Sequence, residues 1–101
     1  MNWRVHVTVQ ARVDMHKAVL WYEEQQPNLG ERFAQELERH FVILSERPLS
    51  GRRVKANIRR LSMDRFPYVL FCTYDAEAGM VDVLVICHTS RNPKTWQDRI
   101  L

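Results

Sequence analysis

The 101-residue chain has room for one hydrophobic core, so we expect a single domain over residues 1–101 and exclude a two-domain organisation. Its composition, 46% hydrophobic and 27% charged with three glycines and four prolines, excludes a disordered, collagen-like or disulfide-scaffolded chain. No apolar run approaches the roughly 20 residues that cross a bilayer, and the first residues lack the apolar core of a signal peptide, so we expect a cytoplasmic protein without a membrane partner.

The net charge of +3 conceals an asymmetry along the chain. Residues 14–46 hold seven acidic and three basic residues, a balance of −4, whereas residues 47–65 hold seven basic residues and one acid, a balance of +6. A cluster of basic residues favours an anionic partner, either nucleic acid or an acidic protein surface. Charge alone fits a solvated basic loop equally well.

The first half of the chain predicts a strand followed by two helices. Apolar and polar residues alternate from residue 3 to residue 9, which indicates a strand with one buried face near a sheet edge. Residues 10–26 contain neither Gly nor Pro and carry an apolar stripe with helical spacing, and Pro27 ends this helix. Asn28 is placed to cap a second helix that runs to about Arg47. So short a connection makes the two helices an antiparallel hairpin.

The second half predicts three strands and a final helix. A breaker cluster at residues 48–51 is followed by predicted strands at residues 57–61, 68–74 and 80–88, the last two buried on both faces and joined by a hairpin loop. Pro93 begins a short helix whose Trp96 faces the body. The expected fold is therefore α+β in the order β-α-α-β-β-β-α, with an antiparallel helical hairpin packed on a mainly antiparallel four-stranded sheet.

We expect one core between the second helix and the sheet. Its predicted members are Phe33, Leu37, Phe41, Leu70, Val83 and Val85. Cys72 and Cys87 lie inside apolar runs, which favours buried reduced thiols over a bridge.

The sequence carries no pattern for metal or cofactor binding. Three separated glycines cannot form a phosphate-binding loop, and neither cysteine has a partner at ligand spacing. The four histidines, His6, His16, His40 and His88, are scattered. We interpret His16 and His40 as helix-surface residues and expect neither a metal nor a cofactor.

The polar segment that follows the last predicted strand is the strongest candidate for a functional site, because loops at strand ends often carry function. His88 is a candidate general base near neutral pH, and Arg91 is a candidate clamp for a phosphate or carboxylate. The alternative for Arg91 is a structural ion pair that ties the last helix to the sheet.

Three further arginines, Arg59, Arg60 and Arg65, are candidates for the same site. Alternation along a strand sends Arg59 and Arg60 to opposite faces, so at most one of them can share the face of the site. Arg65 lies just before an apolar run and is less constrained.

Together these segments resemble the RelE/ParE toxin family, and most closely its ParE-like, plasmid-stabilisation branch. The resemblance covers nearly the whole chain, and its weaker elements are residues 18–30, Arg32-Phe33, Arg47-Pro48 and Arg65-Phe66-Pro67-Tyr68. Its strongest element is His88-Thr89-Ser90-Arg91-Asn92-Pro93 followed by Trp96. The resemblance implies an antiparallel sheet under a helical hairpin. It also implies a cognate antitoxin, ParD-like or similar, whose carboxy-terminal segment wraps the toxin, in a homodimer or a toxin–antitoxin heterotetramer.

The resemblance implies two possible activities. RelE-like members cut messenger RNA in the ribosomal A site, using Lys and Arg on the sheet and, in many, a Tyr in the carboxy-terminal segment. In such a nuclease the candidate catalytic residues here would be His88, Arg91, Arg59, Arg60 and Arg65. Tyr68 stands where an Arg is usual in the nucleases, however, and the terminal aromatic residue is Trp96, whose indole cannot act as an acid or base.

ParE-like members are linked instead to poisoning of DNA gyrase by binding, without catalytic residues of their own. The sequence therefore favours a gyrase inhibitor that is not an enzyme over a ribosome-dependent endoribonuclease. The residues expected to bind the target or the antitoxin are Arg52, Arg53, Lys55, Arg59, Arg65, Arg91 and Trp96. We expect an apolar stripe of the antitoxin in the groove beside the helical hairpin, with its acids against the basic residues from 52 to 65.

Overall fold

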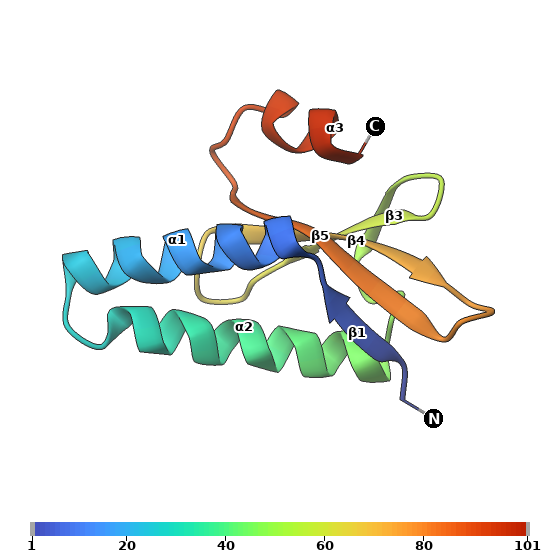
Figure 1. Ribbon diagram of the computed structural model, residues 1–101, viewed down its shortest axis with the longest axis horizontal. Coiled ribbons are helices and arrows are strands. Elements are labelled where there is room, and N and C mark those ends of the chain that lie inside the picture. Colours follow the sequence, from blue (N-terminus) through green and yellow to red (C-terminus); the bar gives the residue numbers. More distant parts are fainter. Residues whose placement is uncertain (1, 101) are drawn as a thin grey trace.

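The computed structural model describes residues 2–100 and confirms the predicted order of elements (Figure 1). The elements are β1 Arg4–Val7, α1 Val9–Gln25, α2 Leu29–Glu46, β2 Arg52–Lys55, β3 Ile58–Ser62, β4 Tyr68–Asp75, β5 Met80–His88 and α3 Lys94–Ile100. The sheet order is β1-β5-β4-β3-β2, with β1 parallel to β5 and every other pair antiparallel. None of the helices in residues 2–100 has the length and hydropathy needed to cross a membrane.

The sheet has five strands, not the four expected from the sequence. The additional strand, β2, forms one edge of the sheet and pairs with β3 across a turn in which Ala56 has a φ of 49°. All four residues of β2 are exposed, and three of them are basic. Without a buried face the strand has no apolar alternation, which is why the sequence did not predict it.

The helical hairpin is held by contacts that the sequence indicated only in part. Thr8 caps α1, because its hydroxyl accepts the Ala11 N–H at 3.2 Å, and the predicted first strand is therefore too long. Asn28 does not cap α2 with its side chain, contrary to expectation, and adopts a left-handed φ of 72°. The carboxylate of Glu23 accepts the N–H groups of Asn28 and Gly30 instead, at 2.9 and 3.1 Å.

Two apolar clusters lie on opposite faces of the sheet, with α1 and α2 covering one face and α3 the other (Figure 1). Phe33, Leu37, Leu70 and Val83 are buried together under the hairpin, as predicted, and Phe41 is half-buried beside them. The prediction for Val85 is wrong. Val85 is buried in the second cluster, on the face that α3 covers.

A β-bulge explains the position of Val85. The pairs Phe71↔Val85 and Cys72↔Val83 leave Leu84 as an extra residue in β5. The extra residue reverses the alternation of side chains along the strand. Odd-numbered residues before the bulge, such as Val83, therefore face the cluster under the hairpin. Odd-numbered residues after it, such as Val85, face the cluster under α3.

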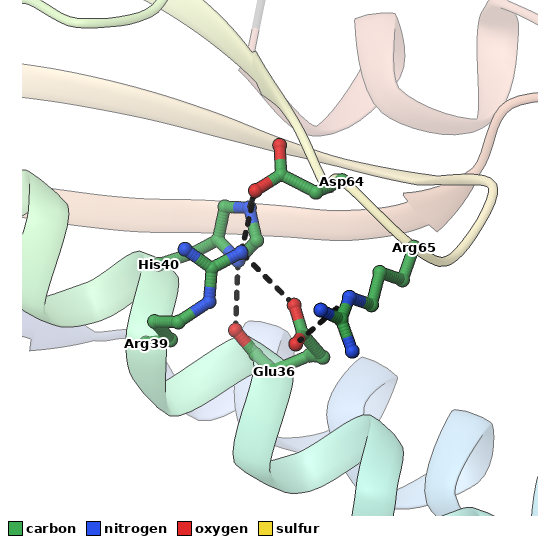
Figure 2. A network of polar contacts seen from close by, with 5 residues as sticks. All are labelled: Glu36, Arg39, His40, Asp64 and Arg65. Carbon is green, nitrogen blue, oxygen red and sulfur yellow. Dashed lines mark hydrogen bonds and ion pairs between the residues drawn. The ribbon is translucent and has the colours of Figure 1, made fainter.

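The prediction for His40 is also wrong, because its side chain is buried and not on the helix surface. His40 lies between Leu37 and Leu44 on the buried stripe of α2, and its Nδ1 lies 2.7 Å from the Glu36 carbonyl oxygen, to which it donates. Figure 2 shows His40 within a polar network that ties the loop between β3 and β4 to α2. Arg39 contacts Asp64 at 2.5 Å and holds the pKa of that carboxyl below its usual value.

The two cysteines are free and buried, as predicted. Burial raises the pKa of the Cys72 thiol to about 12, so this thiol stays protonated near neutral pH. Burial also raises the pKa of Cys87.

Candidate binding site

The carboxy-terminal end of β5 separates two pockets. The hairpin pocket lies between α1, β5 and α3, has a volume of about 500 Å³, and its polar lining residues are Asp14, Lys17, Tyr68, His88, Ser90, Arg91, Thr95 and Arg99. The arginine pocket lies against β2, β3 and the start of α3 and has a volume of about 420 Å³. Its polar lining residues are Arg52, Arg53, Arg60, His88, Thr89 and Arg91, and Trp96 also lines it. His88 and Arg91 line both pockets, so the segment that the sequence singled out forms their common wall.

His88 is held in one tautomer by its neighbour Ser90. The His88 Nδ1 accepts the Ser90 backbone N–H at 3.0 Å and lies 2.8 Å from the Ser90 hydroxyl oxygen. Because a backbone N–H can only donate, Nδ1 has to be unprotonated, and the proton of the neutral ring is on Nε2. The nitrogen that is left for a ligand is therefore a hydrogen-bond donor.

Tyr68 also offers a donor to the hairpin pocket. Its ring packs edge-on against His88, with 5.3 Å between the ring centroids. Burial raises the pKa of the Tyr68 phenol, and the nearby Arg91 opposes this shift only in part. The phenol is therefore protonated at neutral pH.

The arginine pocket is positively charged and fits an anion. Four arginines line it, and no acidic residue of the described part of the chain does. The Arg60 Nε is buried and has no hydrogen-bond partner within residues 2–100. Trp96 also lines this pocket, and its ring stacks on Phe71 with centroids 4.2 Å apart.

Three of the predicted site residues lie elsewhere. Arg59 points to the opposite face of β3 from Arg60, as alternation predicts, and donates to the Gly51 carbonyl at 2.9 Å. Arg65 is 79% exposed and its Nε lies 3.8 Å from a Glu36 carboxylate oxygen, beside α2 (Figure 2). Lys55 is exposed on the edge strand β2 and lines neither pocket.

The ion pair that ties the last helix to the body is made by Arg99, not by Arg91. The Arg99 guanidinium donates to both carboxylate oxygens of Asp14, at 2.5 and 3.1 Å, and this hydrogen bonding raises its pKa. Asp14 also accepts the backbone N–H of Ile86 at 3.0 Å. Arg91 has no carboxylate partner among residues 2–100, so its charge is available to a ligand.

Sequence reasoning missed the contribution of α1 to the hairpin pocket. Asp14, Lys17, Ala18 and Trp21 all line it, and they recur at helical spacing next to the buried stripe. That spacing was visible in the sequence. A helical stripe that mixes charged and apolar residues does not by itself indicate a site, however, and this one does so only because α3 lies opposite to it in the structure.

The comparisons with known proteins agree with this fold. A family model described as the ParE toxin of the type II toxin–antitoxin system parDE matches residues 5–93. A chain of the RelBE2 toxin–antitoxin complex from Mycobacterium tuberculosis is 27% identical, with a TM-score of 0.64, over 87% of this chain and 92% of that chain. No curated protein matches the chain.

Two more distant solved structures show the same fold. A chain of the chromosomal ParDE toxin–antitoxin system from P. aeruginosa is 17% identical, with a TM-score of 0.75, over 85% of this chain and 95% of that chain. The E. coli toxin RelE, as a double arginine-to-alanine variant in the free state, is 16% identical, with a TM-score of 0.69, over 100% of both chains.

Proposed function

We propose, because this chain belongs to the ParE toxin family of type II toxin–antitoxin systems, that it arrests growth by binding and poisoning DNA gyrase and that a cognate antitoxin neutralises it. The proposed mechanism is binding alone, without a catalytic step by the chain. The alternative, ribosome-dependent cleavage of messenger RNA, requires a group that takes a proton from the 2′-hydroxyl of the RNA.

The single observation that carries the proposal is the orientation of His88. Its Nδ1 is occupied by the Ser90 N–H, so the nitrogen left for a ligand of this residue, which lines both pockets, is a donor. A general base has to present an acceptor within hydrogen-bond reach of the proton that it removes. The guanidinium groups beside it carry only hydrogen-bond donors, and the indole of Trp96 is a donor as well. This arrangement supports binding over RNA cleavage.

The arginine pocket supports an anionic surface on the target. Arg52, Arg53, Arg60 and Arg91 converge there, and guanidinium groups bind carboxylates or phosphates through paired hydrogen bonds. We therefore assign target binding to this pocket, with Trp96 as its apolar contact. The same convergence of arginines is what favours the ribonuclease as the second candidate, because an RNA backbone would also fit it.

Two assays with the purified protein distinguish these candidates. A gyrase poison inhibits supercoiling and leaves cleaved DNA when gyrase is trapped, whereas a ribonuclease cuts messenger RNA on programmed ribosomes. We expect gyrase inhibition that Arg60→Ala weakens, with no cleavage of messenger RNA. Cleavage of messenger RNA with gyrase unaffected would overturn the proposal.

The antitoxin is a proposed partner for a separate reason. Two of the similar solved chains come from toxin–antitoxin complexes. We propose a ParD-like or similar antitoxin, in a heterotetramer or with a toxin homodimer. Co-expression with the protein encoded by the neighbouring gene should restore growth and give a complex that copurifies.

A further inference from the structure

The arginine pocket gathers positive charge that nothing in the fold neutralises. Arg52 and Arg53 line it from β2, Arg60 from β3, and Arg91 from the segment between β5 and α3. None of these four forms an ion pair within residues 2–100. Like charges that converge without counterions repel one another and destabilise the fold. An anion bound in the pocket relieves this repulsion.

The side chain of Arg60 points to a ligand for an independent reason. Its Nε is buried and has no hydrogen-bond partner within residues 2–100, and a buried donor without an acceptor is destabilising. The Arg59 Nε is in the same position, but that guanidinium donates to the Gly51 carbonyl on the opposite face of β3. Arg60 lines the pocket instead. The pocket is therefore the place where an acceptor for Arg60 can bind.

The number of donors favours a chain of phosphates over a single carboxylate. Each guanidinium carries several N–H donors and no acceptor, whereas a carboxylate has two oxygens and a single charge. One carboxylate would leave most of the donors of four arginines unused. Successive phosphate groups supply several charges and many acceptor oxygens at short spacing.

The size and the aromatic wall of the pocket fit a nucleotide. Its volume of about 420 Å³ lies in the range of small-molecule sites, roughly 300–1,000 Å³. Trp96 lines the pocket and is fixed there by its stack on Phe71, with centroids 4.2 Å apart. A flat aromatic ring is a surface on which a nucleobase stacks. Beside the arginines, it favours a phosphate chain that carries a nucleoside.

The placement of the neighbouring arginines favours a free nucleotide over a nucleic-acid strand. A strand is bound along a basic groove that follows its backbone. Arg59 lies on the opposite face of β3, and Arg65 lies beside α2 with its Nε 3.8 Å from a Glu36 carboxylate oxygen. These two arginines therefore do not extend the basic surface, and the charge is concentrated in one pocket.

The pocket is suited to a phosphate chain without a metal ion. Magnesium in nucleotide sites is held by one or two carboxylates together with the phosphates, and no acidic residue of the described part of the chain lines this pocket. The arginines neutralise the phosphates themselves and compete with a metal for the same oxygens. Because side chains hold the phosphates, a glycine-rich loop is not required.

We propose that the arginine pocket binds a free nucleoside polyphosphate, with its phosphate chain held by Arg52, Arg53, Arg60 and Arg91 and its base against Trp96. Target binding is assigned to the same pocket, so the nucleotide and the target exclude each other. This last consequence rests on the proposed function, whereas binding of the nucleotide does not.

The three tryptophans allow a direct test, because each marks a different place. Trp96 lines the arginine pocket, Trp21 lines the hairpin pocket, and Trp3 packs against Tyr74. The probes are adenosine triphosphate, inorganic tripolyphosphate and adenosine, each titrated into the ¹⁵N-labelled chain with a chelator present. We expect adenosine triphosphate to bind most tightly and to shift the indole N–H signal of Trp96, with Trp3 and Trp21 unmoved. Excess Mg²⁺ should weaken this binding.

Four outcomes of these titrations would overturn the proposal. They are a shift of Trp21 with Trp96 unmoved, no shift at millimolar adenosine triphosphate, binding that requires Mg²⁺, and tighter binding of adenosine than of tripolyphosphate. Tighter binding of a single-stranded oligonucleotide than of adenosine triphosphate would replace the free nucleotide by a strand.

Replacement of single arginines tests which side chains hold the phosphates. Arg60→Ala should weaken binding of adenosine triphosphate on the order of tenfold, because a buried charged donor is lost. Arg52→Ala should weaken it about threefold, and since Arg52 is exposed, this variant does not depend on refolding of the sheet. The matched control is Arg32→Ala, an exposed residue on α2 that should keep the wild-type affinity. Equal effects of Arg52→Ala and Arg32→Ala would refute the assignment.

The failure of this inference can be told apart from the failure of the proposed function. The titrations contain no gyrase, and their readout is the Trp96 signal. Nucleotide binding at Trp96 by a chain that leaves gyrase active would remove the function and keep the site. Gyrase inhibition by a chain that binds none of the phosphate probes would remove the site and keep the function.

Discussion

Replacing Asp14 with alanine should lower the free energy of unfolding by about 1.5–4 kcal/mol. The Asp14 side chain is 16% exposed and accepts the Ile86 N–H at 3.0 Å. Leaving that part-buried backbone donor unsatisfied costs about 1–3 kcal/mol. The ion pair with Arg99, whose side chain is 26% exposed, adds about 0.5–1 kcal/mol, because water screens part of it.

Three variants separate the two contributions in chemical denaturation. Arg99→Ala removes only the ion pair, and Asp14→Asn should cost a similar amount, since the amide oxygen still accepts from Ile86. Asp14→Ala loses both contributions and should melt roughly 6 °C or more below the wild type, at about 4–8 °C per kcal/mol for a chain of this size. Equal destabilisation by Asp14→Ala and Arg99→Ala would refute the assignment of a separate cost to the backbone donor.

Three further outcomes are expected. Leu37→Ala should destabilise the fold by roughly 2–5 kcal/mol, because Leu37 is fully buried under the hairpin; an unchanged melting temperature would contradict this. The pKa of Asp64 is lowered mainly by the hydrogen bond from Arg39, so the stabilisation by this pair is present above the ordinary carboxyl value of 3.8 and is lost as the pH falls below it. Unfolding titrations should therefore show a weaker acid dependence in Asp64→Asn. His88→Gln, compared at matched soluble levels, should leave growth arrest mostly intact, whereas a nuclease with His88 as general base would lose roughly 10²–10⁴-fold in cleavage.

The helices and strands whose hydrophobic pattern is clear in the sequence were predictable. Features that depend on contacts between distant parts of the chain were not. The bounds of β4 and β5 follow the apolar runs within one residue, because both strands are buried over most of their length. The bulge at Leu84 leaves no mark in the sequence, since every neighbour is apolar and either register buries a hydrophobic side chain. His40 was misassigned because a histidine on a buried stripe is recognised only when its carbonyl partner is known.

The candidate site was predictable at its centre and not at its borders. His88 and Arg91 follow a buried strand, and a polar cluster at a strand end is visible in the sequence. Which arginines join them depends on the faces of β3, and the structure selects Arg60 over Arg59. The role of α1 depends on the docking of α3 through Arg99, a contact across 85 residues of sequence that no local pattern encodes.

The extra residue at Leu84 determines which face of the sheet each later residue of β5 occupies. It lets a single strand supply Val83 to the hairpin core and Val85 to the cluster under α3, so both layers are joined through one continuous backbone. It also decides that His88 leaves the strand beside Tyr68. A deletion of one residue at this point would exchange the two faces from Val85 to His88, so that Val85 would face the hairpin and Ile86 the cluster under α3. A single insertion or deletion would thus rebuild both apolar layers of the fold without changing the type of any residue that lines them.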